Sequence, residues 1–166
     1  GFTGSTFVRD FLKNNTDSKI TNLDALTIGS NLANLKDLEK NQNYNFVKDD
    51  IRNGTQIDSL IKDTDLVVNF AAESHVDRSI ANPKPFIETN VIGTYTILEG
   101  IRKHDKQFIH VSTDELYCDA EDQDSFNEKS ILKPSNPYSA TKAAADHLVG
   151  SYARTYGIKC IITRCT

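Results

Sequence analysis

The sequence predicts an α/β fold, a doubly wound parallel sheet with helices on both faces, and three observations support this class. Short apolar runs typical of strands alternate with helical stretches along the whole chain. Two of the runs, 65–71 (DLVVNFA) and 158–164 (IKCIITR), are almost unbroken, as expected for strands covered on both faces. No internal repeat or domain boundary interrupts the pattern, so residues 1–166 are expected to form one domain.

The first half of the chain alternates three helical stretches with three strands. In order they are helix 5–14 (STFVRDFLKN), strand 19–24 (KITNLD), helix 32–40 (LANLKDLEK), strand 44–48 (YNFVK), helix 55–62 (TQIDSLIK) and strand 65–71. The helical stretches place apolar residues three and four positions apart, and the strands are short apolar runs. The strand at 19–24 has the weakest pattern.

The second half continues the alternation with longer helices. Pro83 and Pro85 precede a long helix at about 86–104, which leads into a strand at 107–112. Residues 117–134 are irregular, and the polar, acidic stretch 119–136 is expected to be a surface loop at the edge of the site. A helix at 137–156 then begins with Pro137, capped by Ser135 or Asn136, and a strand follows at 158–163.

The composition argues against several classes of function. The chain has 19 basic and 23 acidic residues, a net charge of −4, and no Lys/Arg-rich block, which disfavours nucleic acid as a partner. No apolar run reaches the roughly 20 residues of a membrane span, and no signal peptide is visible. Cys118, Cys160 and Cys165 fit no zinc pattern and the histidines form no HExxH motif, so we expect a cytoplasmic protein without a metal.

Both ends of the sequence suggest a fragment of a longer protein. The chain contains no Met, opens on GFTGS and stops on IITRCT, which has the pattern of a strand. We therefore expect the first strand of the sheet and a C-terminal substrate domain to be missing.

The opening glycines form half of a dinucleotide-binding pattern. Gly1 and Gly4 would let the backbone approach a pyrophosphate at the start of a helix. Asp24 lies 20 residues after Gly4, at the end of the next predicted strand, where an acid accepts hydrogen bonds from a ribose diol. This favours NAD over NADP. A tight turn with an Asp in a turn or cap would explain the same residues.

Two later strands also end in residues suited to a cofactor. Asp49 and Asp50 follow strand 44–48, where one could reach an adenine amino group and the other cap a helix. Ala71 and Ala72 end strand 65–71 and are small enough to let a flat cofactor lie against the backbone. Ligands of open α/β sheets bind at such carboxyl ends.

The remaining chemistry lies in an acid pair and a Tyr–Lys pair. Asp114 and Glu115 follow strand 107–112 directly, where they could serve as acid and base or merely form a solvated turn or helix N-terminus. Tyr138 and Lys142 are four residues apart and therefore on one helix face. A nearby ammonium stabilises a phenolate, so this tyrosine could act as an acid/base.

Six segments resemble, in order, motifs of the extended short-chain dehydrogenase/reductase superfamily: GFTGS (1–5), LDALTIGSN (23–31), AAESHVDRS (71–79), FIETNVIGTYTILE (86–99), VSTDELY (111–117) and YSATKAAADHLV (138–149). Within it the chain looks most like the dTDP-glucose 4,6-dehydratases, for which the triplet Thr113-Asp114-Glu115 is the specific match. Two positions depart from the pattern. Cys118 stands after Tyr117 where the family usually has Gly in the local turn, and Ala25 stands where a basic residue that contacts the cofactor commonly follows the acid.

The resemblance implies a Rossmann-like, partial NAD-binding domain and a three-stage reaction on a nucleotide sugar. C4 is oxidised, water is lost across C5 and C6, and hydride returns to C6. Tyr138, helped by Lys142 and Thr113, would take the C4 hydroxyl proton. Glu115 would act as base at C5 and Asp114 as acid at C6.

The resemblance also implies further contacts, a partner and alternatives. Ser74 and Thr113 would contact substrate. The implied cofactor contacts are Gly1, Gly4, Asp24, Thr27, Asp50, Ile51, Ala71, Ala72, Thr89, Tyr138 and Lys142. Helices 86–104 and 137–156 would form a homodimer interface in the full-length protein. Two alternatives stay open: another nucleotide-sugar enzyme, either an epimerase or a decarboxylase, and a non-catalytic NAD-binding protein. The 166 residues alone are expected to be inactive.

Overall fold

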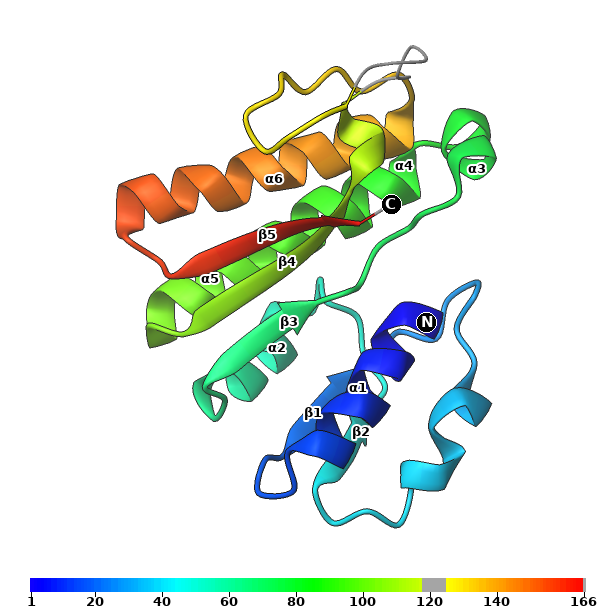
Figure 1. Cartoon of the computed structure of the whole chain (residues 1–166), viewed down its shortest axis with the longest axis vertical. Coiled ribbons are helices and arrows are strands. Elements are labelled where there is room, and N and C mark those ends of the chain that lie inside the picture. Colours follow the sequence, from blue (N-terminus) through cyan, green and yellow to red (C-terminus); the bar gives the residue numbers. More distant parts are fainter. Residues whose placement is uncertain (118–124, 166) are drawn as a thin grey trace.

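The computed structural model describes residues 1–117 and 125–165, in which helices and strands alternate as predicted (Figure 1). The elements in chain order are α1 Phe2–Asn14, β1 Ile20–Leu23, η1 Leu32–Leu38, β2 Tyr44–Val47, α2 Gly54–Lys62, β3 Leu66–Asn69, α3 Val76–Ala81, α4 Lys84–Phe86, η2 Ile87–Gly93, α5 Thr94–His104, β4 Gln107–Thr113, η3 Asp114–Leu116, α6 Pro137–Tyr156 and β5 Cys160–Cys165. The expectations for Cys118 and for part of the loop 119–136 lie outside the described residues.

Several elements differ in detail from the prediction. The long helix 86–104 begins as α4, widens into the π-helical segment η2 and continues as α5. The stretch 32–40 forms the 3-10 helix η1, and the short elements α3 and η3 were not predicted. Strand β5 extends to Cys165 because its register with β4 pairs Thr113 with Cys165. Such boundaries depend on pairing between strands, which a local pattern does not contain.

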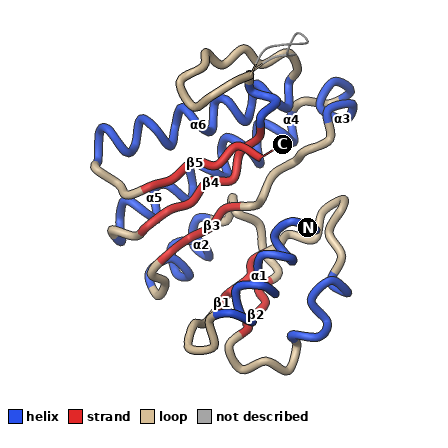
Figure 2. Tube along the Cα trace, in the orientation of Figure 1, coloured by secondary structure: helices blue, strands red, loops and turns tan. Residues whose placement is uncertain are grey.

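The strands form two parallel pieces, separate in Figure 2. Strand β1 pairs with β2, and β3, β4 and β5 pair in that order. In a doubly wound sheet a further strand would lie between β1 and β3. Within residues 1–117 and 125–165 no strand occupies that place, so β1 and β3 each keep an unpaired edge.

Each sheet piece carries helices on one face. In Figure 1, α1 lies in front of β1 and β2, and Val8, Leu12 and Leu35 form a small core there. Helices α2 and α5 lie behind β3 and β4 in the same view. The expectation that 65–71 and 158–164 are covered on both faces is therefore wrong for the described chain: Leu66 is 41% and Ile161 60% exposed. Helix α1 reaches the first of these segments at Phe70, whose ring centroid lies 5.3 Å from that of Phe7.

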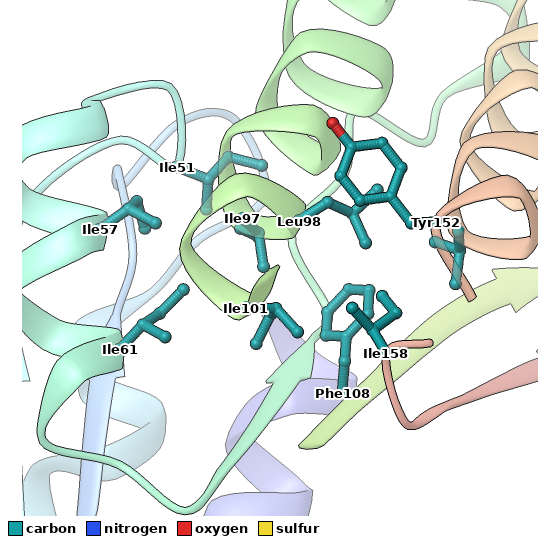
Figure 3. Packing of buried hydrophobic residues seen from close by; sticks show 10 residues of the cluster. Ile51, Ile57, Ile61, Ile97, Leu98, Ile101, Phe108, Tyr152 and Ile158 are labelled. Carbon is teal, nitrogen blue, oxygen red and sulfur yellow. The ribbon is translucent and has the colours of Figure 1, made fainter. Parts of the chain in front are cut away.

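The main core lies between α2, α5, α6 and the larger sheet piece (Figure 3). Leu98 and Ile101 of α5 are fully buried, and Phe108 of β4 is almost so. Each such side chain contributes about 1.5–3 kcal/mol by leaving water. Helix α5 approaches α2 closely because Gly100 lacks a Cβ, which would stand 2.7 Å from the Ile61 Cδ1 atom. In the described part of the chain, no helix is both long enough and apolar enough to span a membrane.

Candidate active site

The predicted site residues gather where parallel strands end. Strands β3, β4 and β5 run in the same direction, with Asn69 opposite His110 and Thr113 opposite Cys165. Their carboxyl ends therefore lie at one edge of the sheet. Ala71 follows β3 at that edge, and η3 continues directly from β4. One edge thus receives the residues that follow β3 and the acid pair.

Helix α6 brings Tyr138 and Lys142 to the end of β4. Its first turn is fixed by a capping box, in which the Asn136 side chain accepts from the Ser139 backbone N–H at 2.8 Å. The backbone N–H of Tyr138 donates to Ser79 Oγ of α3 at 3.1 Å. Lys142 is buried and its ammonium donates to the Val111 carbonyl of β4 at 2.7 Å.

Burial shapes the titration of both groups. Desolvation lowers the pKa of Lys142 to about 8, although the nearby charges of Asp146 and Cys165 oppose this. Desolvation raises the pKa of Tyr138, a hydrogen bond with Thr113 lowers it, and the charges of Glu115 and Asp114 raise it further. The phenol, the Thr113 hydroxyl and both carboxylates are thus close enough to interact.

The acid pair is held by Thr113. This residue caps η3, accepting from the Glu115 backbone N–H at 3.3 Å, and its hydroxyl donates to Asp114 Oδ1 at 3.3 Å. Asp114 is half-buried whereas Glu115 is exposed. The alternative interpretation, an acid pair at a helix N-terminus, therefore describes their local structure correctly. It does not account for their closeness to a buried tyrosine on another element.

At the other end of the site, Gly1 and Asp24 lie together. The N-terminal ammonium of Gly1 donates to Asp24 Oδ2 at 3.0 Å. The other carboxylate oxygen accepts from the Leu26 N–H at 2.8 Å and from Ser30 Oγ at 2.9 Å. Burial would raise the pKa of Asp24, but these hydrogen bonds outweigh it and the pKa is lowered. The glycine turn and the acid are thus adjacent, and Asp24 also stabilises the turn that follows it.

The acids after β2 correct one expectation. Neither Asp49 nor Asp50 caps α2; Asn53 does, by accepting from the Gln56 N–H. Asp50 instead pairs with Arg52 at 2.7 Å. Asn53 takes the cap because it directly precedes the first helical residue, and from there its side chain reaches the free N–H groups of the first turn.

The other predicted contacts vary in exposure. The side chain of Ile51 is buried in the main core, so only its backbone faces outward from that cluster. Ala71, Ala72, Gly4 and Thr89 are half-buried, whereas Thr27 and Ser74 are exposed. These positions remain predictions as cofactor or substrate contacts.

Sequence reasoning missed the residues that hold the site in place. Asn90 of η2 is buried, accepts from the Glu73 N–H and donates to the Glu73 carbonyl and to Thr141 of α6. It thereby ties the loop after β3 to the helix that carries Tyr138. The available signal was weak, because Asn90 is the single Asn of the predicted helix 86–104 but has polar neighbours such as Glu88 and Thr89.

Comparison with known proteins places the chain in a family. The family model described as GDP-mannose 4,6 dehydratase matches residues 1–166. The chain belongs to the GDP-mannose 4,6-dehydratase family. The match runs through both halves of the site, from the Gly1–Asp24 corner to Tyr138 and Lys142.

Relatives within this family are similar over the whole chain but are longer. A dTDP-glucose 4,6-dehydratase of Mycobacterium tuberculosis is 45% identical over 168 residues, covering 100% of this chain and 50% of the relative. The low-salt glycan biosynthesis protein Agl12 of Haloferax volcanii is 49% identical, over 99% of this chain and 53% of the relative. The chain thus spans about half the length of the curated relatives that it matches.

Solved structures agree with the fold. DesIV, a dTDP-glucose 4,6-dehydratase of Streptomyces venezuelae with NAD and TYD bound, superposes with a TM-score of 0.94 at 42% identity, over 99% of this chain and 52% of that one. A UDP-glucose 4-epimerase of Thermus thermophilus in complex with NAD reaches 0.87 at 25% identity, over 99% and 51%. The Rossmann-like fold is shared by dehydratases and epimerases of the family and its neighbours. Distinguishing between these activities therefore depends on the site residues.

Proposed function

We propose that this chain is the NAD-binding half of a dTDP-glucose 4,6-dehydratase, which forms dTDP-4-keto-6-deoxyglucose for deoxysugar biosynthesis. The observation that carries the proposal is the meeting of Tyr138 and Lys142 with Thr113, Asp114 and Glu115 at one sheet edge. An epimerase would have no use for two carboxyl groups beside the tyrosine. A protein that only binds NAD would not need the Tyr–Lys pair.

The residues present suit NAD. Asp24 lies beside the glycine turn at the start of α1, where a carboxylate can accept from a ribose diol while the helix N-terminus faces a pyrophosphate. An acid there repels a 2′-phosphate, which favours NAD over NADP. When bound, NAD accepts the hydride from sugar C4 and later returns it to C6. Residues Ala71 and Ala72 would border the cofactor.

The protein groups move the protons. Tyr138 takes the proton of the C4 hydroxyl as C4 becomes a ketone, and the Lys142 ammonium would stabilise its phenolate against the desolvation that raises its pKa. The ketone acidifies the C5 proton, which the Glu115 carboxylate removes. Asp114, protonated, gives its proton to the C6 hydroxyl, which leaves as water. Two carboxyl groups in different environments can hold these two protonation states, and Asp114 is the more buried of the pair.

The test is product formation by a full-length form that carries this chain. Asp114→Asn and Glu115→Gln should each lower the rate of keto-sugar formation from dTDP-glucose by about 10²–10⁴-fold, the usual contribution of a positioned acid or base. Asp105→Asn is the matched control, because Asp105 is exposed, follows α5 in a left-handed conformation that Asn tolerates and lies outside the site. Normal rates in both site variants would refute the assignment.

We further propose that the full-length enzyme is a cytoplasmic homodimer. Apolar side chains on η2 and α5 are exposed in the single chain, with Ile92 at 48% and Tyr95 at 46%. A second copy of the same helices would cover them. Light scattering should give the dimer mass for the wild type and the monomer mass for Ile92→Arg. A monomeric wild type would contradict the proposal.

A further inference from the structure

A group of buried charged and polar side chains lies beneath the end of β4, behind the candidate site. His110 of β4 is 1% exposed, and Lys142 and Asp146 of α6 are 3% and 4% exposed. Arg164 of β5 stands opposite Ser112 in the sheet and reaches the same group. Burying charge this deeply is costly unless the groups stabilise one another. The buried charges of this group must therefore stabilise one another.

The hydrogen bonds of Asn69 fix the tautomer of His110. Asn69 Oδ1 accepts from the Ala71 N–H at 3.0 Å, so the amide nitrogen of Asn69 faces His110 Nδ1, at 3.4 Å. His110 Nδ1 is then the acceptor, and the ring proton lies on Nε2. Burial and the charge of Lys142 lower the pKa of His110 to about 3, so the ring is neutral at physiological pH. Its Nε2–H group faces Asp146 Oδ1 at 3.7 Å.

The two oxygens of Asp146 have different surroundings. Asp146 Oδ2 accepts from Arg164 Nε at 3.0 Å. Asp146 Oδ1 makes no hydrogen bond within residues 1–117 and 125–165, and 3.7 Å to His110 is too long for one. Lys142 is one helical turn away on the same face of α6.

We infer that Asp146 is a positioning residue for the Lys142 ammonium, with Arg164 holding one carboxylate oxygen and the neutral His110 facing the other. The inference rests on the proposed function, in which that ammonium stabilises the Tyr138 phenolate. The charge of Asp146 opposes the desolvation that lowers the pKa of Lys142, so it raises the pH above which the tyrosine would lose its partner. Arg164 moderates this effect by drawing on the same carboxylate.

The titratable groups that act on Lys142 come from three elements: Asp146 on α6, His110 on β4 and Cys165 on β5. Arg164 on β5 acts through Asp146, and Asp114 and Glu115 on η3 act on Tyr138. Of these, Asp146 and Arg164 can be changed without touching the groups assigned to substrate. Changing Asp146 and changing Arg164 should move the descending limb of the pH dependence in opposite directions, which a general loss of stability would not do.

The test is the pH dependence of kcat/KM for dTDP-glucose, measured in a full-length form that carries this chain. Asp146→Asn should move the descending limb to lower pH by about one unit, so that activity at pH 8 falls about fivefold while activity at low pH is retained. Asp146→Glu keeps the charge, so its descending limb should lie at the same pH as in the wild type. Arg164→Gln removes a cation and frees the carboxylate, so it should move the limb to higher pH; it also serves if Asp146→Asn fails to fold.

The outcomes separate the inference from the proposed function. Opposite shifts in the two variants support the inference. If the wild type is active and the descending limb stays at the same pH in both variants, the inference alone is overturned. The same holds if kcat/KM in the variants falls equally at every pH. A wild type without activity on dTDP-glucose would overturn the proposed function and this inference with it.

Discussion

Replacing Gly93 by Ala should destabilise the protein through a single contact with Ile51. Gly93 ends η2 with ordinary helical dihedrals, so backbone strain does not explain the glycine there. A Cβ at this position would stand 2.3 Å from Ile51 Cδ1 and 2.6 Å from Ile51 Cγ1. Both distances are well inside van der Waals contact, and Ile51 is 7% exposed within the main core. The side chain of Ile51 must therefore move against its neighbours.

The magnitude follows from two opposing contributions. Overpacking a core costs about 1–3 kcal/mol. Placing Ala instead of Gly in a helix gains about 1 kcal/mol. We expect a net loss of up to about 2 kcal/mol in the free energy of unfolding. Gly150→Ala is the matched control on α6, because its Cβ would meet nothing within 4 Å and only the gain of about 1 kcal/mol applies.

Urea unfolding of a full-length form, followed by circular dichroism, measures both variants. A double-mutant cycle with Ile51→Ala then tests the cause, since that change removes Cγ1 and Cδ1 and leaves Cβ at an ordinary 3.7 Å. Ile51→Ala alone should cost about 2–5 kcal/mol, and Gly93→Ala added to it should then gain about 1 kcal/mol, as Gly150→Ala does. The reasoning is refuted if Gly93→Ala stabilises as much as Gly150→Ala, or if the two changes in the cycle are additive.

Three further predictions concern stability. The pKa of His110 is about 3 in the folded state and about 6.5 in the unfolded state, so between these pH values only the unfolded state binds the proton. The free energy of unfolding should therefore fall by about 5 kcal/mol as the pH is lowered from 6.5 to 3. Urea unfolding should show a smaller fall for His110→Gln, which cannot bind that proton. Asn136→Ala removes the cap of α6 and should cost about 1 kcal/mol in the same assay, whereas Asn136→Asp should cost little, and equal losses would contradict the cap. The 166 residues alone should give no cooperative transition in calorimetry, because β1 and β3 have unpaired edges and Ile161 is 60% exposed; a sharp transition would disprove this.

The sequence by itself determined the class of fold and which residues we propose for the site. Apolar spacing is a local property, so it located the helices and strands to within a few residues. Tyr138 and Lys142 share a face because they are four residues apart on a helix, and Asn136 caps it because of its side chain. The family resemblance was likewise present in short motifs, and the match over residues 1–166 confirmed it.

Only the tertiary structure decided how those local elements support one another. The burial of Ile51 against Gly93, the tie from Asn90 to the loop after β3, and the group formed by His110, Asp146 and Arg164 all join residues far apart in sequence. Their energies arise from packing, desolvation and hydrogen bonds across elements, which no periodicity along the chain encodes. For the same reason the break between β1 and β3 became visible only once the strands were paired in space.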